Sequence, residues 1–339
     1  MTKQNMQQWL KNVQQAKHKK AMPILSFPSA ALLGVTIREL TADGELQAKG
    51  MKMIADRCPT LASVSMMDLS VEAEAFGATI RFAEDEVPTV VGALVTSQEE
   101  ADALYIPSVD AGRCPQYLNA IRLASQAITD RPVFAGVIGP FSLAGRLMDV
   151  SEALVNCYAD PDMVHTVMEK TTAFLIDYIN AYKQMGANGV VMAEPLAGML
   201  SPGLATEFSS DYVRKIVDAV QTEDFIVIYH NCGDNILLMT DSIQSTGSAA
   251  YHFGNAVRLA DMIEKFPNDT LVMGNVDPAG QFLRGTPISI KEETQRIMSE
   301  CNAHENFLIS SGCDIPPASD WDNIDAFFAA VEDFYARAE

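Results

Sequence analysis

The sequence predicts an α/β protein, a single (β/α)8 TIM barrel with an N-terminal helix and an insertion after the second strand. Eight short apolar runs recur along the 339 residues, and such runs are typical of parallel strands buried on both faces. Amphipathic, helix-like stretches separate them. Because no Pro/Ser-rich linker divides the chain, we expect residues 1–339 to form one domain. A doubly wound sheet is the alternative arrangement.

The elements follow one another in a regular order. Residues 1–20 carry five lysines and no acidic residue, and without the apolar stretch of a signal peptide they predict a capping helix. Stretches such as 163–185 and 202–220 have apolar residues at helical spacing. Residues 78–115 are acidic and turn-rich, and they predict an inserted hairpin and loop beside the barrel mouth. The expected strands span 22–29, 61–67, 132–139, 189–195, 225–233, 249–254, 270–277 and 306–314.

The charge balance argues against several function classes. Lys and Arg total 24 and Asp and Glu total 44, which gives a net charge of −20. Such a field repels phosphate backbones and anionic lipids, so we expect no nucleic-acid binding and no membrane association. No apolar run reaches the roughly 18 residues of a membrane helix. The six cysteines form no dense framework, which indicates free thiols and a cytoplasmic protein.

Polar and sulfur-bearing side chains gather where the expected strands end. Glu194 ends the fourth strand, His230 and Cys232 end the fifth, and Cys313 ends the eighth. Residues i and i+2 of a strand point to the same side, so His230 and Cys232 project toward one point. In a closed barrel the fifth and eighth strand ends face each other across the mouth, where barrel active sites lie.

One imidazole and two thiolates suit a tetrahedral Zn²⁺ ion, with bonds of about 2.0 to 2.3 Å. Three protein ligands leave a fourth position for a substrate or a displaceable ligand, and Glu194 is the candidate for that ligand. Asn231 and Asp314 are candidates for groups that orient the imidazole. The alternative interpretation is a buried thiol beside a structural histidine.

Several other residues give weaker functional signals than this pattern. His252 ends the sixth run and is interpreted as structural. Asn275 and Asp277 end the seventh run, where an Asp-Pro pair can also begin a helix. Met66 belongs to a set of flexible thioether side chains that suit a pocket for a large apolar face, although such side chains also fill cores.

Seven segments carry a resemblance to a known family. In chain order they are MPILSFPS, MMDLSVEAEAFGA, VIGPFSLAGRL, EPLAGMLSP, YHNCGD, GNVDP and SSGCDIPP. Together they resemble the landmarks of the uroporphyrinogen decarboxylase superfamily, between about Met6 and Tyr335. Within it, the His-x-Cys…Cys pattern of this chain is similar to that of the methylcobamide:coenzyme M methyltransferase branch.

The resemblance implies a TIM-barrel enzyme whose zinc activates a thiol for methyl transfer from a corrinoid. The implied donor is methylcobamide carried by a corrinoid protein, and the implied acceptor is a small thiol such as coenzyme M. The residues expected to act in catalysis and to hold the metal are Glu194, His230, Cys232 and Cys313. Those expected to contact the corrinoid are Met66, Asn275 and Asp277.

Other functions stay open at this point. A corrinoid-dependent demethylase would move a methyl group from a donor substrate to a Co(I) corrinoid. A decarboxylase of the uroporphyrinogen type needs cations for its polycarboxylate substrate, and Arg38 is the only one in the segment after the first strand. A zinc-binding scaffold would not need an open fourth position. For the sulfonate of coenzyme M, Arg146 is the one candidate partner.

Overall fold

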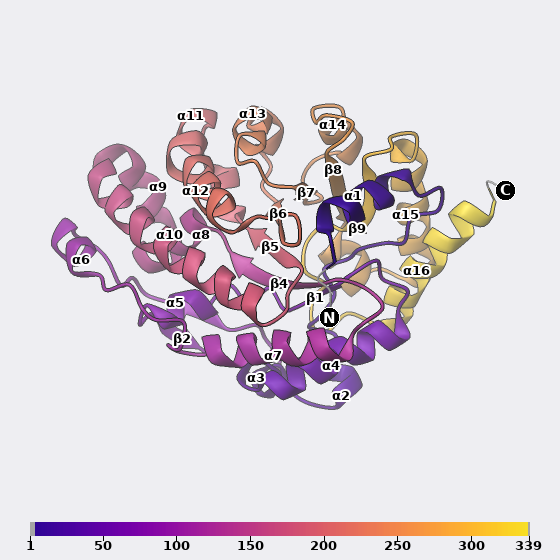
Figure 1. The fold of residues 1–339 in the computed structure, drawn as a ribbon, viewed down its shortest axis with the longest axis horizontal. Helices are drawn as coiled ribbons and strands as arrows, with labels where there is room; N and C mark the ends of the chain where they lie inside the picture. Colours follow the sequence, from indigo (N-terminus) through magenta and orange to yellow (C-terminus); the bar gives the residue numbers. More distant parts are fainter. Residues whose placement is uncertain (1–3, 338–339) are drawn as a thin grey trace.

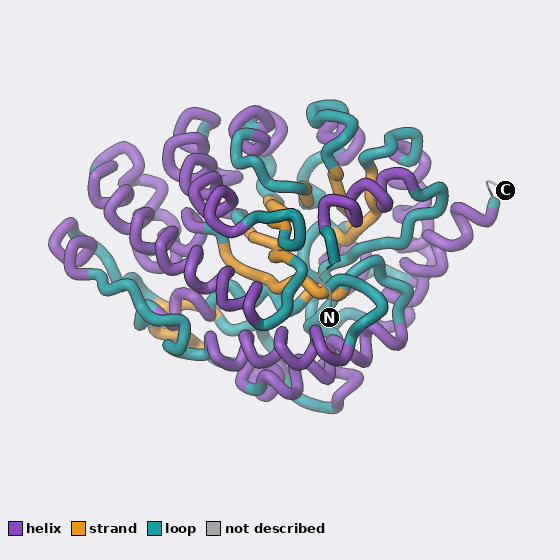
Figure 2. The backbone as a smooth tube through the Cα atoms, viewed as in Figure 1, coloured by secondary structure: helices purple, strands orange, loops and turns teal. Residues whose placement is uncertain are grey.

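A curled, parallel sheet lies at the centre of the molecule. The computed structural model describes residues 4–337, and its main sheet has the order β1-β4-β5-β6-β7-β8-β9 with every neighbouring pair parallel. Helices surround the strands (Figure 1, Figure 2). The strands are β1 (Ser63–Val64), β4 (Val133–Ile138), β5 (Gly189–Ala193), β6 (Ile226–Asn231), β7 (Ala250–Phe253), β8 (Leu271–Val276) and β9 (Phe307–Ser311). Every residue of these strands is buried, as their apolar runs predict.

The first expected strand, 22–29, is not a regular strand in the structure. The backbone at the start of this segment nevertheless reaches both edges of the sheet. Met22 N–H donates to the Ile309 carbonyl in β9 at 3.1 Å, and the carbonyl of the preceding residue, Ala21, accepts from Leu61 N–H, just before β1, at 2.8 Å. Pro23 has no N–H to donate, so a continuous ladder cannot form here. Among the described residues the main sheet therefore has seven regular strands instead of the predicted eight.

Helices and short turns connect the strands. Before β4 they are α1 (Met6–Gln15), α2 (Ser29–Leu33), α3 (Ile37–Ala42), α4 (Gly44–Arg57), α5 (Val71–Ala75), α6 (Gln98–Ala103) and α7 (Cys114–Ala127). Between β4 and β6 they are α8 (Pro140–Met148), α9 (Val150–Ala159), α10 (Pro161–Gln184), η1 (Pro195–Met199), α11 (Pro202–Ala205), η2 (Thr206–Ser210) and α12 (Asp211–Val220). After β6 they are η3 (Ile236–Leu238), α13 (Thr240–Gln244), α14 (Leu259–Ile263), η4 (Pro278–Leu283), α15 (Pro287–Cys301) and α16 (Trp321–Ala336). Proline at the first turn and a side-chain cap, as at Asp160 before α10, mark several starts.

The N-terminal helix α1 packs against the amino ends of the strands. Its side chains Met6, Trp9, Leu10 and Val13 are buried in one cluster with strand residues that include Ile226, Ala250 and Leu271, the first residues of β6, β7 and β8. The Trp9 ring lies 5.8 Å from the ring of Phe134, near the start of β4. In Figure 1, α1 lies in front of the strands. Because the candidate site residues lie near the carboxyl ends, α1 and the site occupy opposite ends of the barrel.

The segment expected as an insertion, 78–115, contains an antiparallel hairpin of β2 (Thr79–Arg81) and β3 (Thr89–Val91), followed by α6. The N–H groups of Leu94 and Val95 both donate to the Leu147 carbonyl at the end of α8. The hairpin was expected, whereas the last part of the range, from Cys114, already belongs to α7.

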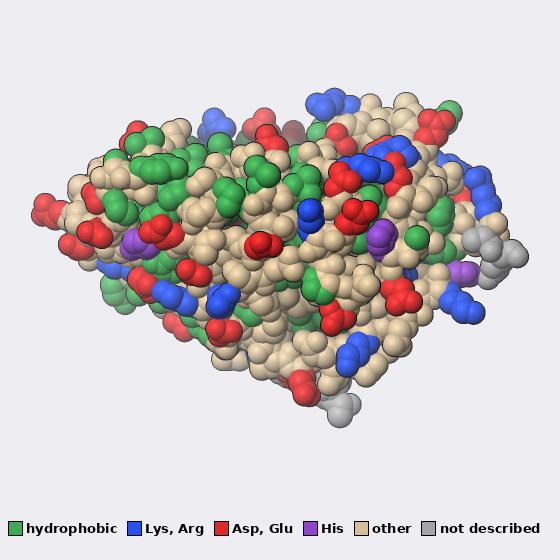
Figure 3. Space-filling model, turned by 90° about the horizontal axis from the view of Figure 1, so that it is seen from above, with side chains coloured by type: hydrophobic (Ala, Val, Ile, Leu, Met, Phe, Trp, Pro, Cys, Tyr) green, Lys and Arg blue, Asp and Glu red, His purple; other side chains and the backbone are tan. Residues whose placement is uncertain are grey.

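Two observations concern membrane-spanning helices and the distribution of surface charge. Among residues 4–337, no helix is long and apolar enough to cross a bilayer. On the face in Figure 3, acidic and basic side chains are interspersed, and no extended basic area is visible there.

Candidate metal centre

Three ligand-type side chains meet where β6 and β9 end. His230 lies in β6, Cys232 follows it, and Cys313 follows β9. One ligand atom from each residue lies within 4.8 Å of those of the other two. The strand geometry therefore brings together the three residues that the sequence pattern singles out.

The imidazole of His230 is buried, and its two nitrogens differ. Nδ1 lies 2.7 Å from Nδ1 of His252 in β7, whereas Nε2 has no hydrogen-bond partner. A buried polar atom without a partner costs free energy unless something else binds it. Nε2 is thus the atom of His230 that is free to bind a metal ion.

The two thiols influence each other. A hydrogen bond from the Cys313 thiol lowers the pKa of Cys232 below its usual range, with a further contribution from His230. The same contact raises the pKa of Cys313. Both cysteines are half-buried, so the cluster is not fully enclosed by the core. A thiolate next to a second thiol and an imidazole is a donor set that Zn²⁺ prefers.

Backbone packing holds Cys232 in place. A Cβ atom at Gly254, directly after β7, would lie 2.4 Å from Cβ of Cys232. Likewise, the backbones of Gly198 and Gly233 approach so closely that a Cβ at Gly233 would lie 2.6 Å from Cα of Gly198. These contacts leave little room for the loop after β6 to move.

Glu194 is not brought to this cluster. Its carboxylate is fully buried and accepts from Phe141 N–H at 2.8 Å, Ser142 N–H at 2.9 Å and the Ser209 hydroxyl at 3.0 Å. These donors oppose the rise that burial causes in its pKa. The carboxylate therefore caps the amino end of α8, which explains its position at the end of β5 without a metal.

The three residues expected to contact a corrinoid each make other contacts in the structure. Met66 is buried in the main core cluster. The Asn275 side chain donates to the carbonyls of Gly254 and Val257 at 2.9 and 2.8 Å. Asp277 accepts from the first N–H groups of η4 at 3.0 and 2.9 Å. Each has a structural task here, and their contact with a corrinoid stays a prediction.

The groups expected to orient the imidazole also have other partners. Asn231 donates to the Glu194 carbonyl and to the Tyr229 hydroxyl, and Asp314 accepts from Met67 N–H. Burial raises the pKa of Asp314 to about 8. The imidazole is instead contacted by His252, which the sequence pattern led us to interpret as structural. Its place at the end of the strand next to β6 was the signal that could have identified it.

A second cluster of charged groups lies beside α5 and α7. Arg113 pairs with Asp68 at 2.6 Å and with Glu74 at 2.6 Å. The Glu72 carboxyl accepts from Ile138 N–H at 3.1 Å, while its second oxygen has no partner, and burial raises its pKa to about 7. Arg146 has a buried Nε atom without a hydrogen-bond partner, and burial lowers its pKa.

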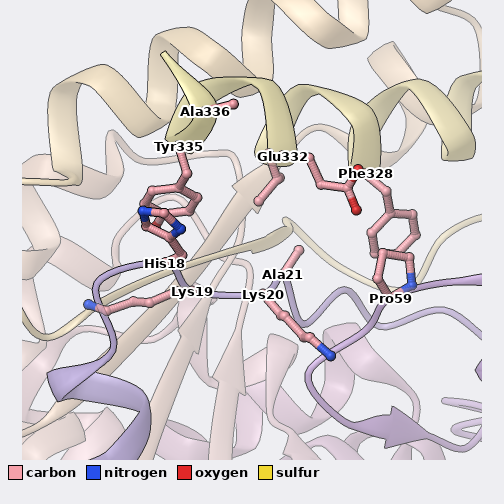
Figure 4. Close-up of a pocket in the computed structure, with 10 residues that line it drawn as sticks. His18, Lys19, Lys20, Ala21, Pro59, Phe328, Glu332, Tyr335 and Ala336 are labelled. Carbon is pink, nitrogen blue, oxygen red and sulfur yellow. The ribbon is translucent and has the colours of Figure 1, made fainter. Parts of the chain in front are cut away.

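A cavity of about 380 Å³ lies away from these groups, between α16 and residues 18–21. His18 stacks on Tyr335 at its rim, with ring centroids 5.1 Å apart (Figure 4). None of the three clustered ligand-type residues lines it. The cavity is therefore separate from the candidate metal centre.

Comparisons with known proteins identify the family and the fold. The family model described as "Uroporphyrinogen decarboxylase (URO-D)" matches residues 18–334. The methylcobamide:CoM methyltransferase MtbA of Methanosarcina acetivorans is 24% identical over 310 residues, which cover 87% of this chain and 88% of that protein. A uroporphyrinogen decarboxylase of Pseudoalteromonas translucida is 25% identical over 296 residues, which cover 83% and 81%. Among solved structures, a methyltransferase from Methanosarcina mazei superposes with a TM-score of 0.86 at 21% identity, covering 99% of this chain and all of that one.

Proposed function

This chain belongs to the uroporphyrinogen decarboxylase family, and we propose that it is a zinc-dependent methyltransferase that moves a methyl group from a methylated corrinoid to a thiol. The observation that carries the proposal is the convergence of His230, Cys232 and Cys313 on one point. The similarity to a relative named as a methylcobamide:CoM methyltransferase supports the same reaction class.

The donor set fits the metal. Two thiolates and one neutral imidazole would compensate the charge of Zn²⁺, and the unpartnered Nε2 of His230 supplies the nitrogen ligand. When bound, Zn²⁺ would lower the pKa of an added thiol so that the thiolate is present at neutral pH. His230, Cys232 and Cys313 would hold it with one position left for the acceptor.

The chain's own residues would then orient the reaction. Cys232 and Cys313 are half-buried, so the acceptor sulfur would lie on their exposed side, where a corrinoid protein could approach. The thiolate sulfur would form a bond to the methyl carbon of the donor substrate as the carbon–cobalt bond breaks, and the electron pair of that bond would stay with the cobalt. The tight packing of Gly254 against Cys232 would keep the sulfur ligand from shifting as the donor arrives.

The predicted role of Glu194 as a displaceable fourth ligand requires its carboxylate to leave three hydrogen-bond donors. We therefore propose that Glu194 holds the start of α8 in the resting enzyme and that the acceptor occupies the fourth position. A glutamate-to-glutamine change at this position should consequently leave the zinc content intact.

A decarboxylase activity is less well supported, although decarboxylases are among the relatives. Arg38 is exposed and pairs with Glu84 at 3.2 Å, and Arg113 is neutralised by Asp68 and Glu74. Cations paired in this way are poorly placed to compensate a porphyrin polycarboxylate.

The proposal is tested with methylcobalamin as donor. We expect the spectrum of methyl-Co(III) to convert to that of Co(I) only when enzyme and an acceptor thiol are both present, with coenzyme M included in the panel of thiols. If no thiol is methylated, but the enzyme transfers methyl groups from a methoxy or methylamine compound to cob(I)alamin, the demethylase alternative is correct.

A further inference from the structure

A chain of hydrogen bonds leads from His230 to the backbone of the N-terminal segment. Nδ1 of His230 lies 2.7 Å from Nδ1 of His252. Nε2 of His252 lies 2.8 Å from Oγ of Ser310 in β9, and this Oγ lies 2.7 Å from the Met22 carbonyl oxygen. The side chains of His230, His252 and Ser310 are all buried, so water does not compete for these contacts.

The Met22 carbonyl, at the end of this chain of hydrogen bonds, fixes the direction of each of them. A carbonyl oxygen only accepts, so the Ser310 hydroxyl donates its single hydrogen to Met22. The Ser310 oxygen must then accept from Nε2–H of His252. A neutral imidazole has one N–H, so Nδ1 of His252 has no hydrogen and accepts from Nδ1–H of His230.

We propose that His252 and Ser310 are positioning residues that hold His230 in the Nδ1–H tautomer. In this tautomer Nε2 of His230 carries a lone pair, and Nε2 is the buried atom that has no hydrogen-bond partner. The inference rests on the proposed metal site, since that lone pair is what a metal ion would bind.

The register of the sheet explains why the chain of hydrogen bonds is possible. His230 and His252 are opposite each other in the parallel pair of β6 and β7, so their side chains point to the same side. The Met22 N–H in turn donates to Ile309 in β9. The orientation of His230 therefore depends on the segment around Met22, which lies between the edge strands β9 and β1.

Loss of the Ser310 hydroxyl should allow His230 to adopt the other tautomer. His252 would lose the Ser310 oxygen as an acceptor for its Nε2–H, and the reverse direction, in which Nδ1–H of His252 donates to Nδ1 of His230, would become available. His230 would then carry its hydrogen on Nε2, where it opposes metal binding. Replacing His252 with phenylalanine removes the acceptor for Nδ1–H of His230 altogether.

The matched control is the neighbouring serine. Ser311 is also buried in β9, and its hydroxyl accepts from Ile24 N–H at 3.0 Å, so Ser311→Ala removes a hydrogen bond to the same segment without touching the imidazoles. Competition with a chelator should show that Ser310→Ala and His252→Phe weaken zinc binding about 10-fold or more. Ser311→Ala should bind zinc as the wild type does.

The tautomer is measured directly by nitrogen-15 NMR of the full-length, histidine-labelled wild type, as purified and after zinc removal. His230→Gln, which lacks the His230 nitrogen signals, assigns them. We expect His230 to be protonated at Nδ1 in both samples. Protonation at Nε2 in the zinc-free wild type, or equal loss of zinc affinity in Ser310→Ala and Ser311→Ala, would overturn the inference. If the wild type binds no zinc, the proposed metal site fails, while the nitrogen signals still decide the tautomer.

Discussion

Individual cysteines differ sharply in their surroundings. Cys58, Cys114, Cys157 and Cys301 are buried, and burial raises the pKa of each. Cys232 and Cys313 are half-buried and contact each other. The first four are therefore typical core thiols, and the last two have the exposure and the neighbours of metal ligands.

This difference predicts the effect of removing single thiols. Cys232→Ala and Cys313→Ala should each lose most of the bound zinc, because two remaining ligands hold the ion poorly. Cys301→Ala, which removes a buried thiol from α15, should keep one zinc per chain. Elemental analysis of the purified variants measures the metal. A full equivalent of zinc in both cluster variants would show that the assigned ligands are wrong.

Gly254 packs closely against Cys232 because it has no side chain. An added Cβ would lie 2.4 Å from Cβ of Cys232, so Gly254→Ala should displace that residue and cost about 1 to 3 kcal/mol of stability. Zinc affinity should fall as well. Gly203→Ala in α11, where nothing lies within 4 Å of the added atom, is the matched control. Equal zinc affinity in both variants would argue against a tightly held Cys232.

The buried carboxyl of Glu72 makes stability depend on pH. Its pKa is raised from 4.5 to about 7, mainly by burial, so the folded state binds this proton more tightly than the unfolded state. The resulting stabilisation is complete below about pH 4.5 and is lost as the pH rises to about 7. Glu72→Gln mimics the neutral carboxyl, so it should match the wild type at pH 4 and exceed it at pH 8 by on the order of 3 kcal/mol at most. Urea denaturation at both pH values measures this, and a constant difference between the two proteins would contradict it.

At the scale of whole elements, α1 has the clearest structural task. Trp9 is 8% exposed and packs with Phe134 at the amino ends of the strands. Trp9→Ala should lower the free energy of unfolding by about 3 kcal/mol. Its zinc content should not change, since the helix and the candidate site lie at opposite ends of the barrel. Loss of zinc from a variant that is still folded would show that α1 also supports the metal centre.

The elements that the sequence predicted least well are those with mixed local signals. The runs that became β4 to β9 are almost continuously apolar, and their positions could be predicted from the pattern alone. In 22–29, Pro23 interrupts the donors of an otherwise apolar run, so the segment crosses the gap between β9 and β1 without a ladder. The second expected strand shortens to Ser63–Val64.

For the molecule as a whole, the proximity of His230, Cys232 and Cys313 could be predicted from the sequence, whereas the hydrogen bonds that hold His230 could not. His230 and Cys232 share one strand, and barrel closure brings Cys313 opposite them. The contact of Ser310 with Met22 joins residues 288 positions apart, and no local pattern encodes it. Glu194 was predicted as a ligand because it ends a strand, but the amino end of α8 lies next to that strand end and binds its carboxylate. The expectation of a single domain and of a cytoplasmic location stays a prediction.

X-ray absorption at the zinc edge tests the central claim most directly, because it counts the sulfur atoms bound to the metal. The purified protein should show two sulfur neighbours, from Cys232 and Cys313, together with lighter neighbours that include His230. Addition of the acceptor thiol should raise the count to three. A sulfur count that stays the same with every thiol tested, including coenzyme M, would contradict the account of this cluster as the place where the acceptor thiol is activated.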